Sequence, residues 1–124
     1  MVEGDKLSIE TERRDGIPIV RARGEIDLYT VSEFDRALKS EIQEGPPALI
    51  VDLSDLSYID SAGLTALLAA YNSLSVREAQ IYVVAPPGNP GVARVLEVTR
   101  FDALVKVCDT VDEALRELNT ARAA

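Results

Sequence analysis

The chain contains no histidine and only one cysteine, Cys108, among its 124 residues. Without histidine it lacks the base of Ser-His-Asp and Cys-His catalysis, a phosphohistidine site and the commonest metal ligand. One cysteine cannot form an intrachain disulfide or a zinc site, which favours a reducing compartment. No glycine-rich segment matches a P-loop or a dinucleotide-binding fingerprint. These absences argue against an enzyme, and we expect neither a cofactor nor a metal.

Positive charge is also scarce. The chain has 13 basic and 21 acidic residues, and its net charge is −8. Nucleic acids and anionic membranes attract basic proteins, so neither is an expected partner. The acidity suits a basic protein partner, although solubility alone explains it equally well. No apolar run is long enough to span a bilayer, and the N-terminus lacks the apolar core of a signal peptide. We therefore expect a cytoplasmic protein.

Aromatic residues make up only 5% of the chain, so the core must be built from Leu, Val, Ile and Ala. The length suits one domain over residues 1–124, with a core of about 5–120. Apolar runs bounded by turn residues predict strands at 7–12, 17–22, 48–51, 81–84 and 104–107. Helical spacing predicts four helices, which begin near Thr30, Asp60, Asn89 and Thr110. The expected fold is α/β, with a mixed, mostly parallel sheet of four to five strands and about four helices.

Local sequence also predicts how these helices begin. Thr30 and Thr110 are each followed three residues later by glutamate, which is the spacing of a capping box. Asn89 precedes a proline and is expected to be an N-cap. Asp60 is the natural N-cap of the second helix, which places Ser61 in its first turn.

Three carboxylates, Asp52, Asp55 and Asp60, lie close together after a predicted strand. They could hold a divalent cation or transfer protons, but capping of turns and of the next helix is the interpretation that we favour. Cys108 lies at a predicted strand end, and we interpret it as a small buried hydrophobic residue rather than a redox sensor.

The position of Ser61 permits a modification. A hydroxyl in the first turn lies at the positive end of the helix dipole, near backbone N–H groups that lack a partner. A phosphoryl group there would add roughly −1.5 to −2 charges and transform the surface without unfolding the domain. The alternative is that Ser61 merely helps to cap the helix.

The helix that follows has an apolar residue at an outer position. Its inner face is expected to consist of Gly63, Leu64, Leu67, Ala70, Tyr71 and Leu74. Its outer stripe consists of Ser61, Thr65, Leu68 and Asn72. Leu68 is therefore apolar on an otherwise polar stripe. It is either a partner contact or an isolated exposed leucine of no significance.

Two motifs resemble those of STAS-domain anti-sigma-factor antagonists. Residues 60–64, Asp-Ser-Ala-Gly-Leu, resemble the Asp-Ser-[small]-Gly-Leu signature of that family, and Val51-Asp52-Leu53-Ser54 and Ile59 fit the same pattern. Residues 24–27, Gly-Glu-Ile-Asp, resemble the Gly-Glu-[apolar]-Asp element before the first helix. The predicted order of strands and helices matches the family over residues 5–120.

The resemblance implies that Ser61 is phosphorylated by a partner that is both an anti-sigma factor and a serine kinase. The unphosphorylated antagonist binds this partner and frees the sigma factor, and phosphorylation releases the antagonist. A phosphatase would reset the switch, ATP belongs to the kinase, and Asp27 would lie near Ser61. Together with the outer stripe, the resemblance predicts a partner-binding surface of Asp27, Thr30, Asp60, Ala62, Gly63, Leu64, Thr65, Leu68 and Asn72.

The match has two modest departures, and other functions stay open. Ala62 and Thr65 stand where relatives often carry Ser or Thr and Gly, and Thr65 could be a minor second phosphorylation site. The main alternative is a structural STAS subunit of a lipid-transport ATPase complex, which needs no phosphorylated serine. A nucleotide-binding module is a third possibility, and the lack of a phosphate loop counts against it.

Overall fold

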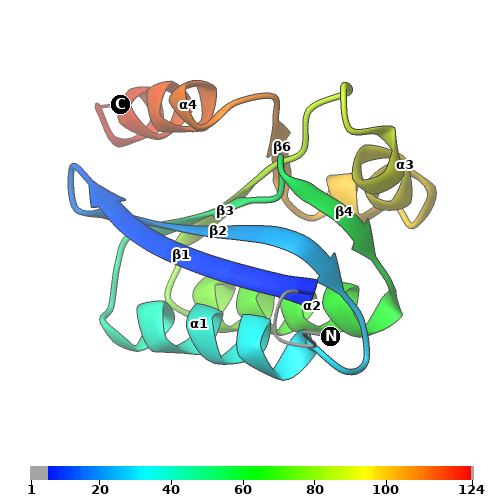
Figure 1. The fold of residues 1–124 in the computed structure, drawn as a ribbon. Coiled ribbons are helices and arrows are strands. Elements are labelled where there is room, and N and C mark those ends of the chain that lie inside the picture. The colour runs from blue at the N-terminus through cyan, green and yellow to red at the C-terminus, as the bar shows by residue number, and fades with distance from the viewer. Residues whose placement is uncertain (1–5, 124) are drawn as a thin grey trace.

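The computed structural model describes residues 6–123, which form one mixed sheet with helices on both faces (Figure 1). The strands are β1 (Leu7–Arg14), β2 (Ile17–Ile26), β3 (Ala48–Asp52), β4 (Leu56–Ile59), β5 (Gln80–Val84) and β6 (Lys106–Cys108). The helices are α1 (Val31–Gln43), α2 (Ser61–Val76), α3 (Pro90–Val98) and α4 (Val111–Ala123). The predicted α/β class and the four helices are confirmed.

The sheet has six strands rather than four to five. Its order is β1-β2-β3-β5-β6, and β4 pairs with β2 off this path. β1 is antiparallel to β2, to which the Asp15-Gly16 turn joins it, and all other pairs are parallel. The additional strand is β4, which lies in a segment predicted as a loop. It has only four residues, so it carries no recognisable alternation.

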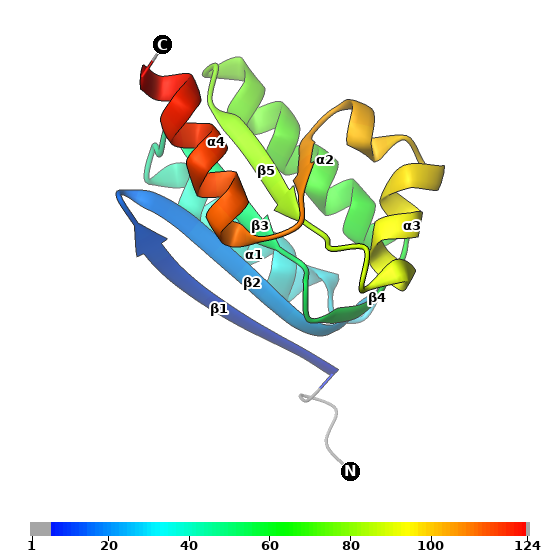
Figure 2. The ribbon, with the colours of Figure 1, turned by 90° about the horizontal axis from the view of Figure 1, so that it is seen from above.

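The two faces of the sheet bury separate clusters. α1 and α2 cover one face with a large aliphatic cluster that includes Phe34, Leu38, Leu67 and Leu74. α4 covers the other face over β3 and β5, and its Leu118 belongs to the smaller cluster (Figure 2). α3 packs against β4 at the end of the sheet. The core is aliphatic, as the composition predicted.

β2 bends where it changes partners. Its first half pairs with β3 and its last residues pair with β4, with a register shift between Gly24 and Glu25. Gly24 has a φ of +103°, and a Cβ there would overlap the backbone carbonyl oxygen of Lys6. Only glycine fits this conformation and this approach. The bend carries the end of β2 to the start of α2.

Thr30 and Asn89 occupy the N-cap positions of α1 and α3, as predicted, but neither side chain makes a cap hydrogen bond. The Thr30 hydroxyl donates to the carbonyl oxygen of Glu25 (2.9 Å) and makes no cap hydrogen bond to α1. The Asn89 amide donates to carbonyl oxygens of the β3–β4 loop, such as that of Ser54 (3.4 Å), and does not cap α3. In both cases the side chain donates to a carbonyl oxygen outside the helix and does not accept from an N–H group of the helix that follows it. The Thr110 cap is confirmed, because its hydroxyl accepts from the Glu113 N–H (3.0 Å).

The last strand lies two residues later than expected. β6 covers Lys106–Cys108, whereas the sequence predicted a strand at 104–107. A 3-10 helix at Phe101–Ala103 and the turn after it occupy the beginning of the predicted segment. Short edge strands have little pattern of their own, so their register depends on the neighbouring strand.

Candidate functional site

The first turn of α2 is capped by Asp60, as predicted. The Asp60 carboxylate accepts hydrogen bonds from the backbone N–H groups of Ala62 (2.9 Å) and Gly63 (3.3 Å). Ser61 is exposed, and its backbone oxygen accepts from the Thr65 hydroxyl (2.8 Å). Within the part of the chain that the structure describes, the Ser61 hydroxyl itself has no hydrogen-bond partner. Ser61 is therefore not needed to cap the helix.

The occupied cap corrects one expectation about phosphate at Ser61. The sequence suggested that unpartnered N–H groups would lie near a phosphoryl group at this position. Asp60 already binds the N–H groups of Ala62 and Gly63, and its carbonyl oxygen accepts from Leu64. A phosphoryl group on Ser61 would thus lie close to the Asp60 carboxylate. The N–H groups at the start of α2 would then stabilise its negative charge less than the sequence suggested.

Gly63 allows α2 to approach the sheet closely. A Cβ on Gly63 would lie 2.6 Å from Cγ1 of Ile59 and 2.8 Å from Cγ2 of Ile26. Both isoleucines are buried at the ends of their strands. The glycine of the motif therefore has a packing role: it sets the position of the turn that carries Ser61.

The turn between β2 and α1 is held by a dense hydrogen-bond network. Asp27 Oδ1 accepts from the N–H groups of Tyr29 (2.9 Å) and Thr30 (3.1 Å). The Thr30 hydroxyl in turn accepts from the N–H of Asp27 (2.9 Å). Each of the two side chains therefore bonds to the backbone of the other. The result is a tight turn closed by three hydrogen bonds between residues 27 and 30.

The pKa of the Asp27 carboxyl lies below its ordinary value. Partial burial acts to raise it, but the hydrogen bonds from Tyr29 and Thr30 and the charge of Lys6 outweigh this effect. The Lys6 ammonium lies 4.0 Å from Asp27 Oδ2. Asp27 is therefore a carboxylate at neutral pH.

The turn at residues 27–30, called the Asp27 turn below, lies beside the first turn of α2. We call the corner of the molecule where they meet the Ser61 corner. β2 and β4 run parallel, with Ile26 opposite Ile59. The Asp60 N–H donates to the Ile26 carbonyl oxygen (3.2 Å), which joins the two segments directly. Asp27 follows Ile26 and Ser61 follows Asp60, so parallel pairing brings together residues that are 34 positions apart in the sequence.

The predicted outer stripe of α2 is exposed. Thr65, Leu68 and Asn72 face solvent together with Ser61, and 39% of Leu68 is accessible. Ala66, which the predicted inner face omitted, is buried. A shallow groove between α1 and α2 runs beside this stripe and is lined by Val31, Ser32, Asp35, Ala62, Thr65, Ala66 and Ala69.

Two residues predicted as partner contacts lie beneath the surface instead. Thr30 is 7% exposed, and its hydroxyl is bound within the turn. Gly63 is buried against Ile26 and Ile59, and Leu64 is half-buried against the core. Thr30 and Gly63 are buried in this structure, and their place in a partner-binding surface stays a prediction. They support the exposed residues around them.

The three carboxylates after β3 have separate structural roles. Asp52 is buried; it accepts from the Ser54 hydroxyl (2.6 Å) and from Arg21 Nε (2.9 Å). Burial acts to raise the pKa of Asp52, but the Ser54 hydrogen bonds and Arg21 lower it overall. Asp55 pairs with Arg23 (3.5 Å) on the surface. Among residues 6–123, no group of three potential ligands is placed to hold a metal ion.

Cys108 is a buried member of the smaller cluster, in line with its interpretation as a hydrophobic residue. Burial, with smaller contributions from nearby glutamates such as Glu117, raises the pKa of its thiol to about 11. The thiolate is the reactive form of cysteine, so this thiol is chemically inert at neutral pH.

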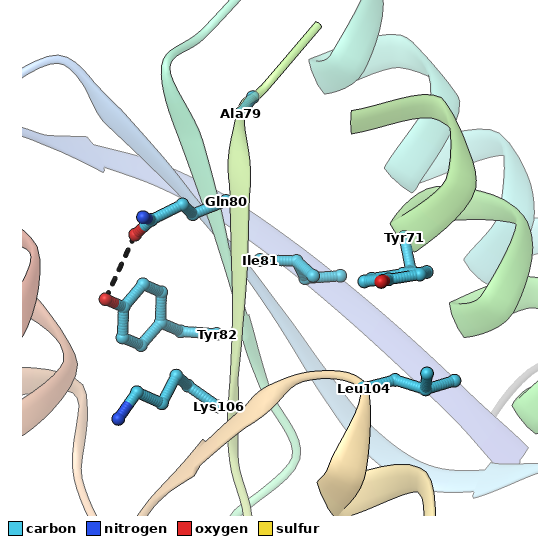
Figure 3. A pocket seen from close by; sticks show the side chains of 7 residues that line it. All are labelled: Tyr71, Ala79, Gln80, Ile81, Tyr82, Leu104 and Lys106. Carbon is cyan, nitrogen blue, oxygen red and sulfur yellow. Dashed lines mark hydrogen bonds between the residues drawn. The ribbon is translucent and has the colours of Figure 1, made fainter. Parts of the chain in front are cut away.

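A separate hollow of about 250 Å³ opens at the edge of the sheet (Figure 3). β6 pairs with β5 only from Tyr82 onward, which leaves the edge beside Gln80 and Ile81 open. The lining side chains come from both sides of β5, and the Tyr82 hydroxyl donates to Gln80 Oε1 (3.1 Å). This hollow lies at the amino end of β5, whereas Ser61 follows the carboxyl end of the parallel strand β4. It is not part of the Ser61 corner.

Sequence reasoning missed two exposed residues of the Asp27 turn. Leu28 is 73% exposed and Tyr29 is 85% exposed. In the sequence they follow the apolar end of a strand and look like its continuation. The available clue was the Asp27-to-Thr30 spacing, which suits a side-chain-stabilised turn.

Comparison with known proteins agrees with the fold and the motifs. The STAS-domain family model matches residues 8–114, and this chain belongs to that family. The anti-sigma-B factor antagonist of Staphylococcus aureus is 32% identical over 101 residues, which are 82% of this chain and 92% of that protein. The crystal structure of an anti-sigma factor antagonist from Mycobacterium paratuberculosis matches at 31% identity with a TM-score of 0.87. It covers 96% of this chain and 99% of the other.

A solved structure of lower sequence identity shares the fold. The Bacillus cell fate determinant SpoIIAA, solved in its phosphorylated form, matches at 19% identity with a TM-score of 0.69 over 90% of this chain and 99% of its own. Separately, none of the helices within residues 6–123 has the length and apolarity required to cross a bilayer.

Proposed function

We propose that this chain is a cytoplasmic anti-sigma-factor antagonist controlled at Ser61. With Ser61 unphosphorylated, it binds an anti-sigma factor that is also a serine kinase and so frees the sigma factor for transcription. Phosphorylation of Ser61 releases the chain. The observation that carries this proposal is the exposed Ser61 hydroxyl, which has no structural task in a first turn that Asp60 caps.

The comparisons support this proposal. Relatives at 31–32% identity that align over most of this chain are named anti-sigma factor antagonists. SpoIIAA, which shares the fold, occurs in a phosphorylated form. In the proposed reaction, Ser61 Oγ attacks the γ-phosphorus of ATP bound to the kinase. ADP leaves, and the hydroxyl proton passes to a base of the kinase. A phosphatase hydrolyses the ester and restores the hydroxyl.

Electrostatics explain why one phosphoryl group would dissociate the complex. It adds roughly −1.5 to −2 charges beside two carboxylates, those of Asp27 and Asp60. Burying a charge without a partner at an interface costs several kcal/mol, and each ~1.4 kcal/mol is tenfold in affinity. A loss of at least about a hundredfold in affinity therefore requires no change of fold.

The test uses Ser61→Ala and Ser61→Glu as baits in a pull-down from a lysate of the native host. We expect the Ala bait to retrieve an ATP-binding anti-sigma factor and the Glu bait to lose it. The retrieved protein, once purified, should transfer phosphate from Mg-ATP to the wild-type chain and not to Ser61→Ala.

Ser73→Glu is the matched control. It adds the same charge at another exposed serine of α2, about 18 Å away along the helix. This bait should retain the partner. If the Ala and Glu baits retrieve the same protein, such as a transporter ATPase, the switch is refuted and a structural-subunit role replaces it.

A further inference from the structure

Leu28 and Tyr29 form an exposed apolar pair that the switch at Ser61 does not explain. They are adjacent in the chain and are 73% and 85% exposed. A single exposed leucine is common on protein surfaces. Two large neighbouring side chains, one aromatic, make a feature that typically binds a partner, because tyrosine is enriched among the residues that dominate interface energies.

The turn beneath this pair holds it in solvent. The Asp27 carboxylate bonds to the N–H groups of Tyr29 and Thr30, and the N–H of Val31 donates to the Asp27 carbonyl oxygen (2.9 Å). The Thr30 hydroxyl ties the turn to Glu25 of β2. The backbone of the pair therefore cannot collapse onto the domain. A preorganised turn of this kind loses little conformational entropy when it binds.

The pair borders the Ser61 corner. The turn follows Ile26, whose carbonyl oxygen accepts from the Asp60 N–H next to Ser61. On its other side the turn leads into Val31 of α1, which lines the shallow groove shared with α2. A protein that contacts Ser61 and the outer stripe of α2 would thus reach Leu28 and Tyr29 without extending over another face.

We propose that Leu28 and Tyr29 are the apolar anchor by which this chain recognises its anti-sigma factor, an inference that rests on the proposed function. The anchor enters an apolar pocket of the kinase. The anchor supplies affinity and selects the partner, whereas the phosphorylation state of Ser61 decides whether the complex persists.

The experiment measures binding of the variants Leu28→Ala and Tyr29→Ala by calorimetry. The probes are the purified kinase-type anti-sigma factors encoded in the same genome, tested one by one with Mg-ADP so that no phosphoryl transfer occurs. Each variant should weaken binding to the cognate kinase by about 10- to 30-fold, the upper value being equivalent to ~2 kcal/mol. With Mg-ATP, both variants should raise the KM for phosphorylation of Ser61 and leave kcat nearly unchanged.

Val76→Ala is the control, since Val76 is also 85% exposed and ends α2 about 22 Å from Ser61. It should bind within twofold of wild type, and all three variants should keep the wild-type melting temperature. If the kinase binds wild type, loses Ser61→Glu and binds both anchor variants within twofold, the anchor is refuted and the switch stands. If no kinase-type anti-sigma factor binds wild type, both proposals are refuted.

Discussion

Replacing Gly63 by alanine tests how the motif positions Ser61. The added methyl group would lie 2.6–2.9 Å from carbons of Ile59 and Ile26. Two of these carbons are attached directly to Cβ, so they can move only if χ1 leaves its rotamer or if a buried strand end is displaced. Overpacking of this kind costs about 1–3 kcal/mol. The better helix propensity of alanine offsets up to about 1 kcal/mol, so the middle of the overpacking range, about 2 kcal/mol, leaves a net destabilisation of ~1–2 kcal/mol.

Thermal unfolding followed by circular dichroism measures this effect. For a domain of 124 residues, the expected loss lowers Tm by roughly 4–8 °C. Gly91→Ala is the matched control, because Gly91 also lies in the first turn of a helix. Its added methyl group would meet its nearest atom, the Ser57 carbonyl oxygen, at an ordinary 3.7 Å. We expect that variant to be as stable as wild type or slightly more stable.

The two variants together show whether a loss of stability comes from close packing at Gly63 or from replacing any glycine in the first turn of a helix. If Gly63→Ala melts at or above the wild-type temperature, the first turn of α2 does not depend on contact with Ile26 and Ile59. The packing role of the motif glycine would then be refuted. If both alanine variants lose stability equally, the cause is common to both helices and is not the contact at β2 and β4.

Four further predictions concern other parts of the molecule. Asp60→Ala should lose the α2 cap and ~1 kcal/mol of unfolding free energy in urea titrations, and Asp60→Asn should retain most of it. The pKa of Asp52 is lowered on folding, so its stabilisation is complete above about pH 4 and is lost as the pH falls through the folded value. Asp52→Asn should therefore cost ~1–3 kcal/mol at pH 7, and this cost should shrink as the pH falls below about 4; a loss that does not change with pH would show that charge is irrelevant. Leu68→Ala should weaken binding to the kinase and change the unfolding free energy by less than ~0.5 kcal/mol, whereas a large loss would make Leu68 a core residue. Cys108, whose thiol pKa is about 11, should react with a thiol reagent at pH 8 only after unfolding, and rapid reaction of the native chain would contradict its burial.

Capping residues and apolar runs in the sequence predicted the structure correctly where the structure depends only on neighbouring residues. The Asp60 cap and Pro90 at the start of α3 agree with the structure, because each acts on backbone within one helical turn. The apolar run at 48–51 became the buried strand β3, since continuous apolar residues are stable only between two covered faces.

The same patterns gave wrong predictions where a side chain or a strand forms its hydrogen bonds outside its own helix or turn. Thr30 has capping-box spacing, yet its hydroxyl bonds to Glu25, and the Asn89 amide bonds to the β3–β4 loop. β4 has almost no pattern of its own and exists because the end of β2 offers it free backbone groups. The Asn89 and β4 misses reflect hydrogen bonds between segments that the sequence cannot place relative to one another, and the Thr30 miss reflects a bond across the Asp27 turn.

The sequence by itself determined the α/β class, the family motifs and the position of Ser61 in the first turn of α2. These properties follow from composition, periodicity and local capping, which act over a few residues. Only the tertiary structure decided that Asp27 and Ser61 share a corner, that Thr30 and Gly63 lie beneath it, and that Leu28 and Tyr29 project from it. The shared corner arises from parallel pairing of β2 with β4, which joins residues more than 30 positions apart, and the exposure of Leu28 and Tyr29 arises from the hydrogen-bonded turn at Asp27.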